Sequence, residues 1–182
     1  MYDTSDVNRA DAAIKEAKIL KKIECDLINQ LVAFYEDPQV NKSYLVLEFS
    51  GQSSLTKFMR ERKQEQAQAQ ENNNKTVAPL LSEELVRTVM RQLFQAVEYM
   101  HRKGICHRDL KPDNIMISSY TPPSHSQQNA NDSHSQGSSS SHVDAIKIKV
   151  IDLNVAFEVT PENPRIAFAT GLKEWSAPET RT

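Results

Sequence analysis

The first 50 residues combine one helical pattern with two extended patterns of apolar residues. Residues 8–23 place apolar side chains at helical spacing, and these are Ala13, Ala17, Ile19, Leu20 and Ile23. This spacing predicts an amphipathic helix. The segments "QLVAFYED" (30–37) and "SYLVLEF" (43–49) are rich in Val, Leu and aromatic residues, and Pro38 and Asn41 lie between them. We expect an antiparallel pair of strands joined by a turn.

A longer helix and another strand are predicted further along. Ser82 precedes two acidic residues and an apolar stripe that ends before Gly104, and the stripe consists of Leu85, Val89, Leu93, Val97 and Met100. Acids at the start, basic residues at the end and a terminal glycine are typical of a complete helix. The segment "IKIKVID" (146–152) alternates with period two, which indicates a strand with its lysines facing outward.

Two polar stretches interrupt these elements. Residues 61–76 are rich in Gln and Asn, and residues 118–144 are rich in Ser, His, Asn and Gln. Such compositions bury too little apolar surface to order themselves, so both are expected to be low-complexity insertions. The histidines of the second stretch are His125, His134 and His142. Their spacing offers no regular set of zinc ligands, which favours a solvated tract over a metal site.

Composition limits the class of protein. The chain has 182 residues and 38% hydrophobic content, enough for one domain or for part of a larger one. Its formal charge of -2 gives no general attraction to nucleic acid or anionic membranes. Cys25 and Cys106 do not form a disulfide framework, and no apolar run reaches the roughly 20 residues of a membrane span. These features predict a soluble protein of the cytoplasm, with the nucleus as an alternative.

One short segment has an unusual composition. In "ICHRDLKPDNIMI" (105–117), Asp109, Lys111 and Asn114 lie between apolar triplets that would fix both ends of a loop to a core. Each residue alone is ordinary polar surface. Together with Asp152, however, they supply a carboxylate to accept a proton, a cation to neutralise a moving phosphoryl group, and oxygens to hold Mg²⁺. The combination favours phosphoryl transfer.

Three motifs in this order resemble the eukaryotic protein kinase family. "HRDLKPDN" (107–114) matches the catalytic loop H-R-D-L-x-x-x-N, and its Lys-Pro pair is similar to the serine/threonine branch. "KVIDLNVAF" (149–157) falls where the D-F-G triplet should be, and "SAPE" (176–179) matches the A-P-E element. In the altered triplet, Leu153 keeps an apolar plug in place of phenylalanine. Asn154 tolerates the positive φ for which glycine is usually needed.

The resemblance implies a function and a set of site residues. It implies an α+β fragment of the two-lobed kinase fold that transfers the γ-phosphoryl group of ATP to Ser/Thr hydroxyls of a protein substrate. Asp109 is then the base, Lys111 the charge stabiliser, and Asn114 and Asp152 the Mg²⁺ ligands. A regulatory protein partner is also in keeping with the family.

The resemblance also assigns the first half of the chain. The helix at 8–23 corresponds to the helix called C, with Glu16 as its glutamate. Leu20, Leu31, His107 and Leu153 fall where the family stacks its regulatory spine. "YLVLEFSG" (44–51) resembles the strand leading into the hinge.

The adenine site follows from that register. Leu47 is the expected gatekeeper, the backbone of Glu48 and Ser50 faces the adenine, and Met116 lies beneath it. "AAIK" (12–15) is similar to the family's V-A-I-K motif. Lys15 directly precedes Glu16, however, and adjacent residues on a helix point in different directions, so Lys15 is predicted to be an exposed lysine.

Several family features are absent from this sequence. It has 4 glycines and no G-x-G-x-x-G, and no strand lysine precedes the first helix. We therefore expect a fragment with residues 1–50 in the small lobe and 51–182 in the large lobe, largely inactive in isolation. Leu172 stands where serine/threonine kinases usually have threonine. The alternative is a pseudokinase, or a truncated binding module without catalysis. Substrate, subfamily and upstream regulator are not encoded in these motifs.

Overall fold

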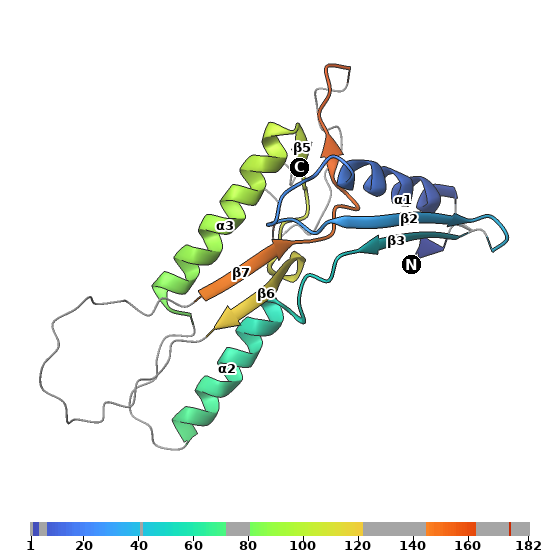
Figure 1. Cartoon of the computed structure of the whole chain (residues 1–182). Coiled ribbons are helices and arrows are strands. Elements are labelled where there is room, and N and C mark those ends of the chain that lie inside the picture. The colour runs from blue at the N-terminus through green and yellow to red at the C-terminus, as the bar shows by residue number, and fades with distance from the viewer. Residues whose placement is uncertain are drawn as a thin grey trace, which may run out of the picture.

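The structure is a computed structural model that describes residues 2–3, 7–40, 42–71, 81–121, 145–162 and 175. Two groups of elements lie side by side in it, one from the N-terminal third and one from the rest of the chain (Figure 1). No described helix is both long enough and apolar enough to cross a membrane.

The N-terminal group is a helix laid along a small antiparallel sheet. Helix α1 (Val7–Leu20) precedes strands β2 (Leu31–Asp37) and β3 (Lys42–Leu47), and β1 (Tyr2–Asp3) pairs with β3 to give the order β1-β3-β2. The predicted helix and strand pair are thus confirmed, with α1 starting one residue earlier and ending three residues earlier than expected. The apolar residues expected on its inner face are buried, as is Ile23 after it.

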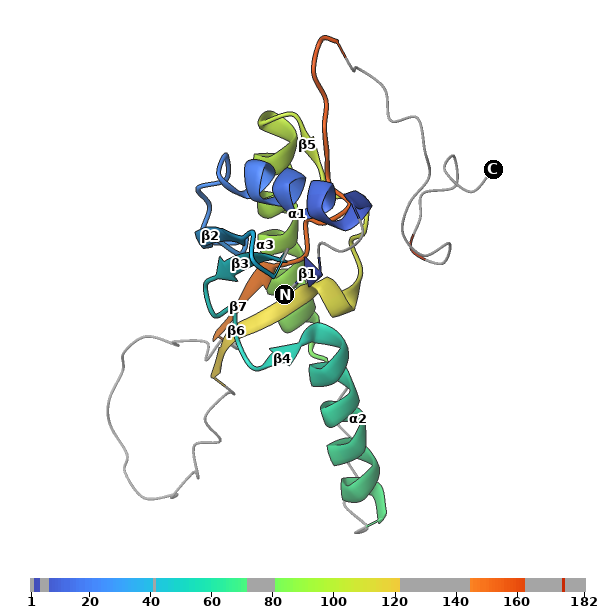
Figure 2. The ribbon, with the colours of Figure 1, turned by 90° about the vertical axis from the view of Figure 1, so that its right-hand side faces the viewer.

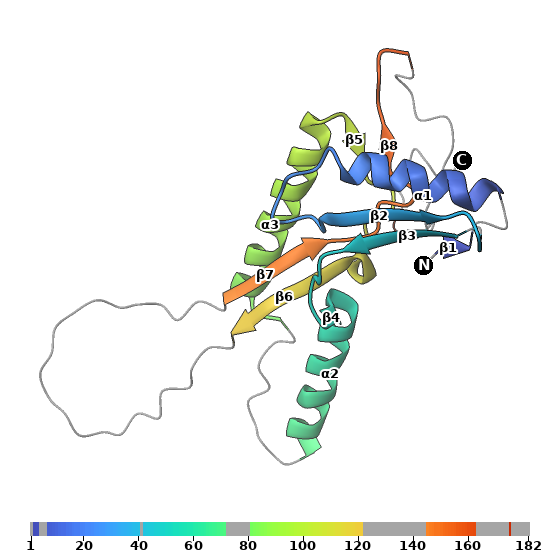
Figure 3. The same cartoon turned by 45° about the vertical axis from the view of Figure 1, so that its right-hand side comes forward.

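The second group is built on a hairpin. Strands β6 (Ile115–Thr121) and β7 (Ala145–Val150) pair antiparallel, and the two-residue strand β4 (Ser53–Ser54) pairs with the other edge of β6. Helix α3 (Glu83–Arg102) packs against β7, as the views of Figures 1 and 3 show. Its expected start is confirmed, because the Ser82 hydroxyl accepts a hydrogen bond of 3.1 Å from the Leu85 amide.

Short elements complete this group beside α3. Strand β5 (Ile105–Cys106) pairs with β8 (Phe157–Glu158), and a 3-10 turn η1 (Pro112–Asn114) leads directly into β6. The residues between β5 and β6 are those of the "HRDLKPDN" motif, so the predicted loop is fixed to the fold at both ends.

The prediction that residues 61–76 lack order is wrong for residues 61–71. Helix α2 (Leu55–Glu71) runs through them and extends away from the rest of the fold (Figure 2). The apolar start of the helix is anchored by buried Phe58, and glutamine, alanine and glutamate are good helix formers that propagate a turn already nucleated. Residues 72–80 lie outside the described part of the chain.

The second polar stretch also begins in regular structure. Residues 118–121, expected to be part of an insertion, are the end of β6. They order because they pair with β7, as in Tyr120 opposite Ile146, and because the Tyr120 ring meets the Phe58 ring at 5.0 Å between centroids. Residues 122–144, with the three histidines of the tract, lie outside the described residues.

Two apolar clusters hold the elements together. The larger one joins the N-terminal group to α3 and β7, and its buried members are Ile19, Leu20, Ile23, Ile28, Ala96, Met100, Ile105, Val150, Leu153 and Ala156. The smaller one lies between α2, α3 and the β6–β7 hairpin, and its buried members are Phe58, Leu85, Val89, Ile115, Ile117, Ile146 and Ile148.

Val150 connects the two groups through its backbone as well as its side chain. Its amide donates to the Leu27 carbonyl at 2.8 Å, and its carbonyl accepts from the Asn29 amide at 2.9 Å. These bonds form a parallel bridge between Ile28 and Val150. The loop after α1 is thereby attached to the end of β7.

The fold depends on this residue in a measurable way. Val150 is 0% exposed and Val32 is 65% exposed, although both are strand valines. We expect Val150→Ala to lower the free energy of unfolding by about 2 kcal/mol or more, because it removes two buried methyl groups and leaves a cavity. Val32→Ala, the matched control, should lie within about 1 kcal/mol of the parent chain. Urea denaturation followed by circular dichroism measures both, and equal losses would contradict the assigned core.

Candidate active site

The "HRDLKPDN" loop gathers its polar side chains on one carboxylate. The Lys111 Nζ donates to Asp109 Oδ2 at 2.6 Å, and the Asn114 Nδ2 donates to the same oxygen at 2.9 Å. Asn114 also donates to the Asp109 backbone carbonyl at 2.8 Å. The side chains of Lys111 and Asp109 are 19% and 11% exposed, so the group is largely shielded yet reachable from solvent. The structure thus brings together the three residues for which the sequence predicted a catalytic role.

Asp152 reaches this loop from the end of β7. The Ile151 amide donates to the Asn114 carbonyl at 3.0 Å, which attaches the residue before Asp152 to the end of the catalytic loop. Burial lowers the pKa of His107 and the charge of Asp152 partly opposes this, while the hydrogen bond to Asp109 raises the pKa of Lys111 and Asp152 adds to it, so Asp152 lies near both residues. The fourth residue predicted for phosphoryl transfer therefore lies beside the other three.

Two residues of the site have a left-handed backbone. Arg108 has φ 67° and Asp152 has φ 68°, and they are the residues other than glycine with positive φ in the described part of the chain. This conformation costs of order 1 kcal/mol for such residues and tends to occur at functional sites. The sequence suggested Asn154 for a positive φ, but the strained position in the altered triplet is the aspartate itself.

His107 supports the loop through contacts of both ring nitrogens. It is buried, its Nε2 lies 3.0 Å from the Ile151 carbonyl, and its Nδ1 accepts from the Asp109 amide at 3.3 Å. A carbonyl only accepts and an amide only donates, so the ring carries its proton on Nε2 and is neutral. Burial is the main cause that lowers the pKa of His107 below its ordinary value of 6.5, against smaller opposing contributions from the Ile151 carbonyl, Asp152 and Asp109.

Lys111 is held in its charged form. Its hydrogen bond to Asp109 is the main cause that raises its pKa above the ordinary value, and Asp152 and Asp113 add to the effect. The lysine therefore supplies a permanent positive charge at the catalytic carboxylate at neutral pH.

The donor atoms here suit Mg²⁺. The nitrogen of the Asn114 side chain is committed to Asp109, so its oxygen is the atom left for a cation, and Asp152 adds a carboxylate. Mg²⁺ prefers oxygen ligands and usually takes one or two from the protein, with water and phosphate completing its shell. Among the described residues, no three His, Cys, Asp or Glu residues cluster as a protein-only metal site, and a phosphate-dependent Mg²⁺ site does not need such a cluster.

Arg108 attaches the start of the following segment to the loop. Its Nε donates to the Val155 carbonyl at 2.7 Å, and its guanidinium lies 5.6 Å from the centre of the Phe157 ring. Lys15 of α1 approaches the same ring at 5.8 Å. Lys15 is exposed and Glu16 is buried, which confirms that these two neighbours on the helix point in different directions.

Three of the four predicted spine residues share one apolar cluster. Leu20 and Leu153 are buried in the larger core, and Leu31 packs against it. His107, the fourth, binds the carbonyl of Ile151, two residues before Leu153. Leu153 is 1% exposed, so leucine does fill the apolar position that follows Asp152.

The hinge segment follows β3. Leu47 ends β3 opposite Leu31 and is 36% exposed, Ser50 is buried, and Met116 on β6 is half-buried. The Glu48 amide donates to the Gln30 carbonyl at 3.0 Å, and its carboxylate accepts from the Gln30 amide at 3.0 Å. The segment is thus tied to the residue before β2.

Sequence reasoning missed one partner of the hinge. The Nζ of Lys149 lies 2.5 Å from Oε1 of Glu48, and the Lys149 side chain is 16% exposed. The strand pattern had predicted this lysine to face outward. Glu48 and Lys149 are 101 positions apart. The sequence does not indicate their ion pair, because the contact depends on how the β6–β7 hairpin packs against the segment after β3. Leu172 and "SAPE" (176–179) lie outside the described residues.

The buried neutral histidine makes stability depend on pH. Because the pKa of His107 is lowered in the folded chain, the unfolded chain binds the proton more strongly below pH 6.5, and folding stability is lost as pH falls through that range. We expect His107→Gln, which keeps a donor but does not titrate, to flatten this dependence, by up to about 1.4 kcal/mol per pH unit. Denaturation at pH 7.5, 6.5 and 5.5 measures it. His101→Gln, at an exposed histidine of α3, is the control, and parallel curves for parent and His107→Gln would contradict the assignment.

Sequence comparison identifies relatives of the whole chain. The sequence profile of the protein kinase domain matches residues 2–181. The serine/threonine-protein kinase RAD53 of Saccharomyces cerevisiae is 31% identical over 116 residues, which cover 64% of this chain and 12% of that protein. The human serine/threonine-protein kinase ULK1 is 29% identical over 165 residues, covering 91% of this chain and 12% of ULK1. The chain thus spans about an eighth of the length of these two relatives.

Solved structures agree with the sequence comparison. A crystal structure of the Rad53 kinase domain and SCD2 superposes with a TM-score of 0.55 at 26% identity, over 83% of this chain and 41% of that one. The same protein in complex with AMPPNP gives a TM-score of 0.52 at 25% identity, over 79% and 40% of the two chains. The expected fold class, an α+β fragment of the two-lobed kinase fold, is confirmed. Since the profile covers nearly every residue, the chain belongs to the protein kinase family, serine/threonine type, and comprises part of its domain.

Proposed function

We propose that these residues belong to an ATP-dependent protein kinase that transfers the γ-phosphoryl group to Ser or Thr hydroxyls of protein substrates. The observation that carries this proposal is the joint contact of Lys111 and Asn114 with Oδ2 of Asp109, with Asp152 beside them. It is the arrangement that phosphoryl transfer to a hydroxyl requires.

Asp109 orients the attacking hydroxyl and accepts its proton. Its two described side-chain contacts go to Oδ2, and we assign the other oxygen, Oδ1, to the substrate. The hydrogen bonds of Asn114 to both the carbonyl and the carboxylate of Asp109 fix the rotation of the side chain. A fixed carboxylate lowers the entropic cost of aligning the hydroxyl with the phosphorus.

Cations neutralise the negative charge that develops on the transferred phosphoryl group. Lys111 is protonated and lies next to the base, so its ammonium group can follow the transferred phosphoryl. Asn114 and Asp152 would hold Mg²⁺, which when bound with ATP neutralises the phosphate oxygens.

The hinge supplies the nucleotide site in this proposal. The backbone of Glu48 and Ser50 faces the adenine, Leu47 lies behind it and Met116 beneath it. Glu16, which is buried, corresponds in this proposal to the helix C glutamate of the family. Nucleotide binding is supported by the neighbouring Rad53 kinase domain in complex with AMPPNP.

Partners and location follow from the same proposal. In this proposal the substrate is a protein and a regulatory protein partner is also expected, both on the ground of membership in the protein kinase family. The boundaries stay as proposed, with the small lobe at residues 1–50 and the large lobe at 51–182, and the location as cytoplasmic or nuclear.

The base is tested by substitution. In the full-length polypeptide that carries these residues, we expect Asp109→Asn to lower Mg-ATP-dependent phosphorylation of a generic basic substrate about 10²- to 10⁴-fold, the usual contribution of a general base. Asp26→Asn, at an exposed aspartate of the loop after α1, makes the same chemical change away from the site and should leave the rate unchanged. Incorporation of labelled phosphate measures both variants.

The same assay separates catalysis from a binding role. If Asp109→Asn retains the parent rate, Asp109 is not the base. If neither parent nor variant transfers phosphate, while a partner binds independently of Mg²⁺ and nucleotide causes no thermal shift, the chain belongs to a pseudokinase or another non-catalytic binding module.

A further inference from the structure

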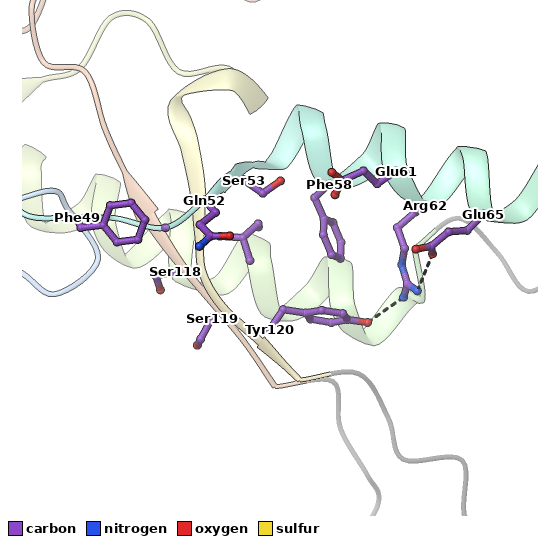
Figure 4. Close-up of a pocket in the computed structure, with 12 residues that line it drawn as sticks. Phe49, Gln52, Ser53, Phe58, Glu61, Arg62, Glu65, Ser118, Ser119 and Tyr120 are labelled. Atoms are coloured by element: carbon purple, nitrogen blue, oxygen red, sulfur yellow. Dashed lines mark hydrogen bonds and ion pairs between the residues drawn. The ribbon is translucent and has the colours of Figure 1, made fainter.

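A cavity of about 520 Å³ lies away from the catalytic loop, between α2 and the outer edge of β6. This volume is within the usual range of ligand sites, roughly 300 to 1,000 Å³. None of the residues that line it is among those assigned to the base, the metal or the adenine. Figure 4 shows Phe49 at one end and the pair Arg62 and Glu65 at the other.

The cavity lies at the edge of a strand. Ser118, Ser119 and Tyr120 all line it, although consecutive side chains of a strand point to opposite faces. The pairing of β6 is irregular between Ile117 and Ser119, but Ser119 and Tyr120 are regularly paired neighbours with β7 and both line the cavity, so the cavity extends along the edge of the strand. Ser118 and Ser119 are exposed, and Tyr120 is half-buried.

This edge lacks a neighbouring strand among the described residues. The sheet has the order β4-β6-β7, and β4 pairs with only Met116 and Ile117 of β6. The chain before β4 turns aside at Gly51, which has φ +123° and lies against the Ile117 carbonyl so closely that a Cβ would come within 2.1 Å of its oxygen. Pairing with β4 on this side therefore stops at Ile117, and no described strand pairs with the outer edge of β6 from Ser118 to Thr121.

Helix α2 forms the opposite wall with a mixed surface. Phe58, Arg62 and Glu65 follow one another at helical spacing and line the cavity with Glu61. Arg62 lies 5.6 Å from the centres of both the Phe58 and Tyr120 rings and donates to the Tyr120 hydroxyl at 2.9 Å. The Arg62 guanidinium is thus already in contact with Phe58 and Tyr120.

The acids of the wall are more available than the arginine. The side chains of Glu61 and Glu65 are 49% and 67% exposed, against 33% for Arg62, and their ion pairs with Lys57 and Arg62 are both 3.7 Å long. The free charge facing the cavity is therefore negative. Phe49, 79% exposed, adds an uncovered aromatic ring beside it.

We propose that the β6 edge from Ser118 to Thr121 binds an extended segment of a partner protein, which adds a strand there and presents a lysine or arginine to Glu61 and Glu65. Strand addition gives affinity through backbone hydrogen bonds, and side-chain pockets give specificity. The outer edge of β6, which has no described strand partner beyond Ile117, would supply the backbone hydrogen bonds. Glu61, Glu65 and Phe49 would supply the specificity. The partner is thus a β-prone, basic segment, whether or not the chain transfers phosphate.

The test uses the 182-residue chain, labelled with ¹⁵N, and three synthetic probes. The first is the acetylated, amidated pentapeptide Thr-Val-Lys-Val-Thr. The second has glutamate in place of lysine, and the third is the first peptide with alternate amides methylated, so that it cannot pair with a strand. We expect the lysine peptide to shift the amide signals of Ser118 to Thr121 and to slow the hydrogen exchange of those amides that do not donate to β7. The glutamate peptide should bind at least threefold more weakly, and the methylated peptide should cause no shift.

Matched variants test the charge. Glu61→Gln with Glu65→Gln should weaken binding of the lysine peptide about threefold at low salt, in keeping with two partly screened contacts. Glu83→Gln with Glu98→Gln changes two exposed glutamates of α3 in the same way, distant from the cavity, and should have no effect. Circular dichroism confirms that each variant is folded, and none of the four side chains is buried.

Four results would overturn the proposal. They are signal shifts confined to other parts of the chain, equal binding of the lysine and glutamate peptides, and an unchanged affinity of the Glu61 and Glu65 double variant. The fourth is slow exchange, before any peptide is added, of those Ser118 to Thr121 amides that do not donate to β7, which would mean that the chain itself or a second copy already covers the edge. Sedimentation of the parent chain distinguishes those two occupants.

Discussion

The backbone exchange between Val150 and the loop after α1 is the constraint on which the site depends. Val150 binds Leu27 and Asn29 through its amide and carbonyl, and its side chain is fully buried. The next residue, Ile151, donates to the Asn114 carbonyl and accepts from His107. Leu153 then enters the larger core. Val150, Ile151 and Leu153 thus attach to the loop after α1, the "HRDLKPDN" loop and the larger core, and Asp152 has little freedom of position left between them.

This tethering explains how two strained residues persist in the site. A left-handed backbone at Arg108 and Asp152 is unfavourable in an isolated peptide and needs support from its surroundings. Arg108 is supported by the buried His107 that precedes it and by its own hydrogen bond to the Val155 carbonyl. Leu153 is buried directly after Asp152. With this backbone, Asp152 lies close enough to Lys111 to interact with it electrostatically.

The local patterns in the sequence predicted most of the elements but not the contacts between distant ones. The stripe from Leu85 to Met100 and the Ser82 cap identified α3, and motif spacing identified the cluster around Asp109. Helix α2 was not predicted, because the polar composition of residues 61–76 was weighed without the buried Phe58 near the start of the helix. The Glu48–Lys149 ion pair was missed because alternation along β7 does not show that the hinge covers the outward face of the strand.

The register of the β6–β7 hairpin finally explains why two short motifs form one site. Asn114 directly precedes β6 and Asp152 closely follows β7, and Ile115 lies opposite Val150. The start of one strand and the end of the other therefore meet, and the two residues assigned to Mg²⁺ meet with them. A slip of one residue would turn Ile115, Ile117, Ile146 and Ile148 out of the smaller core, so apolar burial fixes the register. The irregularity in pairing between Ile117 and Ser119 lies farther along the hairpin. The apolar side chains that hold α3 against β7 thus also bring together Asn114 and Asp152, the two residues proposed to bind Mg²⁺.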